Sequence, residues 1–249
     1  MSAEPQRTDA GRARRPGALL WWALGLLAAF ALMGVAVAVA PSSPFTQGLD
    51  DWWRSVNGAA PDSGAYTWFL PMFFQHLGEA PGALLCLLIP IALAVVGRWR
   101  SALFFFSAYL VSMGILSTGM KNLVSRPRPA ADEALGLFGP LFSVDHGSYP
   151  SGHAVTTAFL VFGIAALLPQ ARPIARRTWW IIGAALMLGM MWQRTLINAH
   201  WLSDTLFGLV AGTAGTLLMW WAFWPLLRAD EGRPVWFLHR SVSLAATPA

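Results

Sequence analysis

The sequence predicts an all-α, polytopic membrane protein with six transmembrane helices. The 249-residue chain is 56% hydrophobic and only 12% charged, whereas soluble domains carry about 25% charged residues. Its apolar residues are gathered into uncharged runs, each near the length that crosses a bilayer. The 14 tryptophans suit a protein with two water–lipid interfaces. A single cysteine excludes an internal disulfide.

Each expected helix corresponds to one uncharged run. These runs cover residues 18–40, 80–97, 101–120, 154–171, 178–193 and 205–227. The first run could instead be a signal peptide, because Ala36-Val37-Ala38 resembles a cleavage site. It is longer than the roughly 7–15 apolar residues of a signal core, which favours a retained span. Pro90 is expected to kink the second helix.

The domain boundaries follow from the same runs. We expect a membrane domain over residues 17–228, flanked by a disordered tail at 1–16 and a second tail at 229–249. Residues 41–79 are predicted to form a loop outside the membrane core. Within this loop the aromatic stretch 66–77 either lies flat in the interface or packs beneath the loop.

Basic residues predict the topology. Six crossings put 12 of the 17 Lys and Arg on the same face as both termini, and the positive-inside rule makes that face cytoplasmic. The other five are Arg54, Lys121, Arg126, Arg128 and Arg194. Four of these lie near the ends of the third and fifth helices, against the topology rule, so we expect them to bind an anion. The +5 net charge therefore does not indicate nucleic-acid binding.

Three short motifs bring polar groups to this outer face. Lys121, Arg128 and Arg194 can neutralise a phosphate, and arginine forks bind it in a bidentate manner. Ser151 and Gly152 lie at a predicted helix start, where unpaired N–H groups and the helix dipole favour an anion.

Two histidines and an aspartate complete the cluster. His200 and Asp204 are four residues apart, hence expected on one helical face. Asp204 could then fix the tautomer of His200, as the carboxylate of a catalytic triad does. His153 remains available as a general acid.

Together the motifs resemble those of the type-2 phosphatidic acid phosphatase superfamily. That pattern is Lys, six residues, Arg-Pro; then Pro-Ser-Gly-His; then Ser-Arg, five residues, His, three residues, Asp. The chain matches it with Lys121 and Arg128-Pro129, with Pro150–His153, and with Arg194, His200 and Asp204. Gln193 stands where the family usually has Ser. The resemblance covers roughly residues 80–226, and the helix layout extends it towards residue 18.

The resemblance implies a mechanism that uses no metal and no cofactor. His200 would attack phosphorus and form a phosphohistidine, His153 would protonate the leaving oxygen, and Asp204 would orient His200. Lys121, Arg128, Arg194, Ser151 and Gly152 would bind the phosphate. Arg126 and Gln193 are expected to be auxiliary, Arg126 through a phosphate or headgroup contact.

The expected function is hydrolysis of a lipid phosphate in the cell membrane, with the site on the extracytoplasmic ends of helices 3–6. Undecaprenyl diphosphate, phosphatidic acid and phosphatidylglycerophosphate all fit. The alternatives are a lipid phosphotransferase with the same first half-reaction and a non-catalytic lipid-binding protein. A vanadate-dependent haloperoxidase is disfavoured because those enzymes are soluble. The expected partners are the bilayer and the lipid substrate, with no oligomeric state predicted.

Overall fold

A computed structural model describes residues 14–60, 63–65, 67–134, 136–140, 142 and 147–231. Over these residues the secondary structure is helical, apart from one isolated bridge between Asp132 and Leu137. The elements are α1 (Gly17–Val39), α2 (Gln47–Asn57), α3 (Phe69–Gly78), α4 (Ala80–Val95), α5 (Trp99–Tyr109), the π-helix η1 (Leu110–Thr118), α6 (Gly119–Leu123), α7 (Gly152–Leu167), α8 (Pro173–Leu196) and α9 (Leu202–Glu231).

Each predicted run contains a helix, with α5, η1 and α6 continuous over the third run. The predicted loop at 41–79 differs, because it contains the two helices α2 and α3. The helix α9 extends to Glu231, slightly beyond the predicted domain end at residue 228. Most of the two predicted tails, 1–13 and 232–249, lies outside the described residues.

Within the described part of the chain, fewer helices than the six predicted are long and apolar enough to count as membrane spans. Among the described residues, α1, the continuous helix Trp99–Leu123 and α9 are long and apolar enough to cross a membrane. The pair α3 and α4, bent by 51°, would be a fourth. Apolar α7 has 16 residues and is short for a span. The six-span layout therefore stays a prediction.

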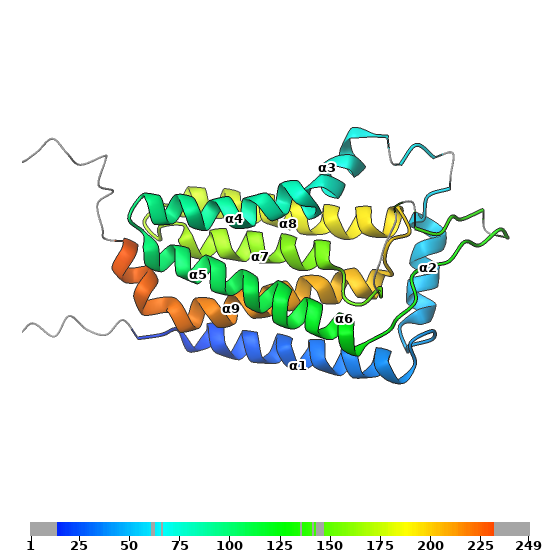
Figure 1. Ribbon diagram of the computed structural model, residues 1–249, viewed down its shortest axis with the longest axis horizontal. Coiled ribbons are helices and arrows are strands. Elements are labelled where there is room, and N and C mark those ends of the chain that lie inside the picture. Colours follow the sequence, from blue (N-terminus) through cyan, green and yellow to red (C-terminus); the bar gives the residue numbers. More distant parts are fainter. Residues whose placement is uncertain are drawn as a thin grey trace, which may run out of the picture.

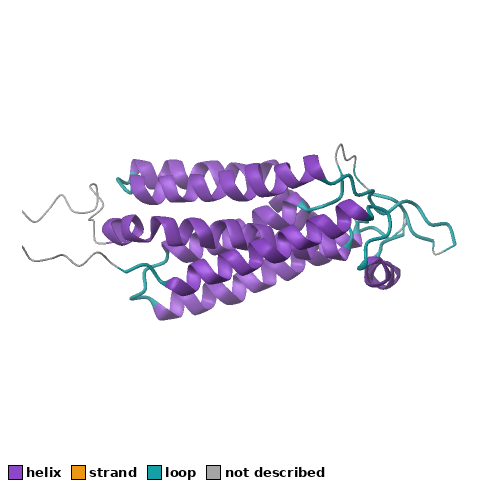
Figure 2. Cartoon of the chain, turned by 90° about the horizontal axis from the view of Figure 1, so that it is seen from below, coloured by secondary structure: helices purple, strands orange, loops and turns teal. Residues whose placement is uncertain are grey.

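The long helices run side by side along the long axis of the molecule (Figures 1 and 2). The start of α1, the end of α9 and the connections α4–α5 and α7–α8 lie at one end (Figure 1). At the other end α2 crosses the bundle beside the loop that follows α6 and the α8–α9 turn (Figure 1). This arrangement places the three motifs at the end opposite to the start of α1 and the end of α9.

Close packing of α7 against α9 joins the second and third motifs. A Cβ on Gly208 would lie 2.7 Å from the Ser151 carbonyl oxygen, and one on Gly212 would lie 2.4 Å from that of Val155. Small residues at this spacing let helix backbones approach closely. The backbone N–H of Ser151 donates to the Asp204 carbonyl at 3.0 Å, so the start of α7 is fixed to the start of α9.

At the opposite end of the bundle, buried Asp230 caps α5. Its Oδ2 accepts hydrogen bonds from the Ser101 backbone N–H at 2.9 Å and the Ser101 hydroxyl at 3.1 Å. Asp230→Ala leaves a helix N-terminal N–H unsatisfied, and we expect a loss of about 1–3 kcal/mol. Thermal unfolding in detergent measures it, with exposed Asp51→Ala as the matched control. Equal melting temperatures for the two variants would contradict the capping role.

Candidate active site

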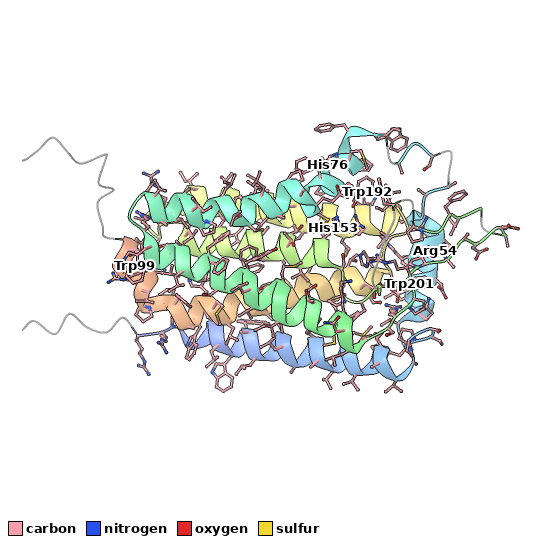
Figure 3. All side chains as sticks on the ribbon, viewed as in Figure 1. Arg54, His76, Trp99, His153, Trp192 and Trp201 are labelled. Atoms are coloured by element: carbon pink, nitrogen blue, oxygen red, sulfur yellow. The ribbon has the colours of Figure 1, made fainter. Side chains whose placement is uncertain are left out.

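The three motifs meet where α6, α7 and α9 end or begin at the α2 end of the bundle. In Figure 3, His153 on α7, Arg54 on α2 and Trp201 at the start of α9 lie toward this end, and Trp99 lies at the other. The structure therefore brings together the residues that the sequence motifs single out. It also adds contributions from α2 and α3, which the sequence interpretation left out of the site.

The three cations of the motifs hydrogen-bond to neutral oxygens. Lys121 Nζ donates to the Gly147 carbonyl at 2.8 Å. Arg128 Nη1 donates to the Ala199 carbonyl at 2.5 Å. Arg194 Nη1 donates to the Gln75 side-chain oxygen at 2.6 Å. No described carboxylate lies within ion-pair distance of Lys121 or Arg194, so their charge is available to an anion.

His200 lies in the turn before α9, which begins at Leu202, so the expected i,i+4 placement on one helical face is wrong. Its Nδ1 lies 2.8 Å from the Ser148 carbonyl but 3.9 Å from Asp204 Oδ2. Because a carbonyl only accepts, Nδ1 carries the proton. The other nitrogen, Nε2, lies 3.2 Å from Arg128 Nη1. Asp204 acts on this arrangement indirectly, because the Ser148 hydroxyl donates to it.

Burial keeps His200 neutral. Desolvation lowers its pKa well below 6.5, and the charges of Arg128, Arg194 and Lys121 lower it further. A neutral imidazole with Nδ1 protonated presents a lone pair at Nε2. The turn therefore places the Nε2 lone pair of His200 against the Arg128 guanidinium.

His153 packs against the end of α3. Its ring is hydrogen-bonded to the Gln75 backbone and interacts with the charges of Arg194, His200 and Arg128. A Cβ on Gly78 would lie 1.8 Å from His153 Cδ2 and 2.7 Å from Nε2. Only glycine at position 78 leaves the imidazole where it is.

Gly78→Ala is therefore expected to displace His153 and to lower kcat about 100-fold, the scale of a 1 Å misplacement at a reacting centre. Steady-state assays on a lipid phosphate check it. Gly25→Ala is the matched control, since a Cβ there meets nothing within 4 Å. Wild-type kcat in the Gly78 variant would show that His153 does not need this clearance.

Three buried motif atoms lack hydrogen-bond partners among the described residues: Ser151 Oγ, His153 Nε2 and Arg194 Nε. Ser151 is also the residue before the first turn of α7, and its side chain makes no cap hydrogen bond. Buried polar atoms are normally paired, so unpaired ones need an explanation. All three atoms can donate a hydrogen bond. Ser151 and His153 also lie at the start of α7, and a helix N-terminus favours an anion.

Arg126 has a position different from the one expected for an auxiliary phosphate or headgroup contact. Its side chain is fully buried between two carboxylates, with Nη2 2.8 Å from Asp50 and Nη1 2.7 Å from Asp204. It also donates to the Ser203 hydroxyl at 2.8 Å and to the Gln47 amide oxygen at 3.0 Å. A guanidinium engaged in this way ties α2, the loop after α6 and α9 together.

Two of the residues that sequence reasoning left out of the site lie on α2. Asp50 is 1% exposed and accepts hydrogen bonds from the Ser203 backbone and hydroxyl. Arg54 donates to the Ala130 and Phe138 carbonyls and to Asn198, so it braces the loop after α6 against the α8–α9 turn. A usable signal was present: Thr46 is a residue type favoured at helix N-caps, and Asp50 supplies an acidic residue in the first turn.

An all-helical bundle with three or four membrane-length helices, and with cations and imidazoles gathered at one end, defines a membrane-embedded protein with a candidate anion site. The family model of the PAP2 superfamily matches residues 102–228, just over half of the chain. The chain belongs to the PAP2 superfamily, which confirms the resemblance seen in the motifs.

Two curated relatives are lipid A 1-phosphatases. The one from Rhizobium johnstonii is 33% identical over 150 residues, 59% of this chain and 57% of the relative. The one from Rhizobium etli is 31% identical over 59% of this chain and 60% of the relative. The chain thus spans under two thirds of these relatives' lengths.

A solved structure shares the fold. It is a transmembrane PAP2-type phosphatidylglycerolphosphate phosphatase from Bacillus subtilis, with a TM-score of 0.63 at 19% identity. The match covers 80% of this chain and 94% of the other.

Proposed function

We propose that the chain is a membrane lipid phosphatase that hydrolyses a phosphoester or diphosphate through a phosphohistidine, without a metal. The observation that carries this proposal is the set of buried atoms on Ser151, His153 and Arg194 that have no partner in the described part of the chain. A phosphate oxygen is an acceptor that would satisfy the Arg194 Nε–H and the Ser151 hydroxyl. His153 Nε2, once protonated, would donate to the ester oxygen.

In the first half-reaction, Nε2 of His200 attacks phosphorus and the bond between phosphorus and the lipid oxygen breaks. His153 gives its proton to that oxygen, and the lipid product leaves. Lys121, Arg128 and Arg194 stabilise the charge that builds on the other phosphate oxygens. Ser148 holds the Nδ1–H of His200, and its carbonyl favours the positive charge that His200 gains.

In the second half-reaction, a water molecule attacks phosphorus while His153 takes its proton. The phosphorus–nitrogen bond of His200 breaks, and inorganic phosphate leaves. The Ser151 hydroxyl and the backbone N–H of Gly152, at the start of α7, support the same oxygens in both steps. We further propose that the site faces the extracytoplasmic side and that both termini are cytoplasmic, as the charge distribution predicts.

The substrate class is a lipid that carries a terminal phosphate near the membrane surface. The lipid A 1-phosphatase relatives favour a phosphate on a sugar of a glycolipid. Undecaprenyl diphosphate, phosphatidic acid and phosphatidylglycerophosphate remain the competing substrates. The motif residues contact only the phosphate in this scheme, so specificity comes from groups around them.

A substrate panel on the purified full chain tests the function. We expect release of inorganic phosphate from at least one of the four lipids, with no acceptor lipid and with EDTA present. Loss of activity in EDTA with recovery in Mg²⁺ would contradict the metal-free scheme. Transfer to an added lipid without phosphate release would identify a phosphotransferase. Binding without turnover of any lipid would identify a non-catalytic protein.

The pH dependence should report the charge of Arg128. Because the wild-type pKa of His200 lies well below 6.5, His200 stays neutral somewhat below pH 6.5. Its protonation should lower kcat/KM only at a more acidic pH. Arg128→Gln removes a nearby positive charge, so protonating His200 becomes less costly and its acid limb moves to higher pH. Arg128→Lys keeps the charge and serves as the control. An unmoved or lower limb in Arg128→Gln would contradict the assignment.

A further inference from the structure

A buried glutamine on α3 contacts the phosphate-site arginine of the third motif. Gln75 is 3% exposed, and its side-chain oxygen accepts hydrogen bonds from Arg194 Nη1 at 2.6 Å and from Gln193 Nε2 at 3.2 Å. Its Nε2 donates to Glu79. One amide therefore connects the end of α8 to α3, a segment outside the three motifs.

The partners of Gln75 fix the orientation of its amide. The reversed orientation would set an NH₂ group against the Arg194 guanidinium and the amide oxygen against the Glu79 carboxylate, so both contacts would become unfavourable. Glu79 therefore turns the amide oxygen toward Arg194. Gln193 adds a second donor to the same oxygen. The contacts with Glu79, Arg194 and Gln193 therefore all favour the same orientation of the Gln75 amide.

Holding Arg194 with an amide has a different electrostatic result from holding it with a carboxylate. Arg126 lies between Asp50 and Asp204, whose two charges more than offset its own. Arg194 is held at one nitrogen by a neutral oxygen, and its Nε has no hydrogen-bond partner among the described residues. Its orientation is thus fixed while its charge stays available for phosphate.

We propose that Gln75 is a positioning residue that aims Arg194 at the substrate phosphate, and that Gln193 acts by holding Gln75. This inference rests on the proposed function. It also gives a role to the residue that departs from the family pattern. A serine at position 193 has a side chain shorter by the carbonyl carbon and one methylene, so it would lack the reach by which Gln193 meets α3.

The main test is Gln75→Met, which keeps the volume of the side chain and removes its hydrogen bonds. We expect kcat/KM for the lipid phosphate to fall about 10- to 100-fold, the scale of one hydrogen bond to a charged group, with inorganic phosphate inhibiting correspondingly less. Gln193→Ser should give a smaller, several-fold loss. Gln170→Met, an exposed position at the opposite end of the bundle, is the matched control.

A double-mutant cycle with Arg194→Ala separates positioning from a general structural role. If Gln75 acts through Arg194, Gln75→Met has no further effect on kcat/KM or on phosphate inhibition in the Arg194→Ala background. An equal loss in both backgrounds, or unchanged kinetics in Gln75→Met, would overturn the inference. The proposed function would still stand in either case, provided that the unmutated chain releases phosphate from a lipid. A wild-type chain that turns over none of the lipids would overturn the proposed function itself.

Discussion

Replacing His200 with alanine should lower phosphate release by about 10,000-fold or more, because the proposed mechanism depends on His200 as the nucleophile and alanine offers none. The imidazole is held by the Ser148 carbonyl at Nδ1, with Nε2 beside Arg128. Water would have to attack the lipid phosphate directly in this variant. Single-turnover assays with a labelled lipid phosphate measure the remaining rate.

The matched control is His76→Ala, on α3. His76 is a largely exposed imidazole whose ion-pair partner is Glu79, and its loss should leave turnover within a few-fold of the wild-type value. Thermal unfolding of both variants separates loss of chemistry from loss of fold. A His200→Ala protein with normal turnover would rule out the phosphohistidine.

The second large effect is expected on stability, from Arg126→Leu. This change leaves the buried carboxylates of Asp50 and Asp204 without the guanidinium between them. Breaking a buried ion pair by removing one partner typically costs about 3–5 kcal/mol, and two carboxylates are affected. We expect a markedly lower melting temperature in detergent and loss of activity, because Asp204 also holds Ser148 beside His200.

The double variant Arg126→Leu with Asp50→Asn should recover part of that stability, since one uncompensated charge is removed along with the arginine. Its activity should stay low, because Asp204 remains without its partner. If Arg126→Leu alone kept the wild-type melting temperature but lost activity, Arg126 would instead be the auxiliary phosphate contact that the sequence suggested.

Much of the bundle could be predicted from the sequence. The apolar runs gave the positions of α1, α4, α7, α8 and α9 because burial in lipid demands uninterrupted apolar stretches. The motifs identified Lys121, Arg128, Ser151, His153, Arg194, His200 and Asp204 as one cluster, and the structure brings them to one end of the bundle. The spacing of the motifs in the sequence was enough to predict this cluster, because each motif lies at the end of a helix.

Other features depended on tertiary contacts that spacing does not encode. The i,i+4 rule placed His200 and Asp204 on one helix, but α9 begins two residues after His200, so a backbone carbonyl from another segment fixes the tautomer. Likewise Arg126 was predicted to contact a phosphate or headgroup, but it is buried against Asp50 of α2. Gln75 lacks any local signal of its contact with Arg194.

The most direct test is to trap the intermediate. The purified full chain would be mixed with a ³²P-labelled lipid phosphate in EDTA, quenched within one turnover under alkaline conditions, and digested for mass spectrometry. We predict an acid-labile, base-stable phosphoryl group on His200, absent in His200→Ala and present in His76→Ala. Release of phosphate with no label on His200 at any quench time would contradict the account.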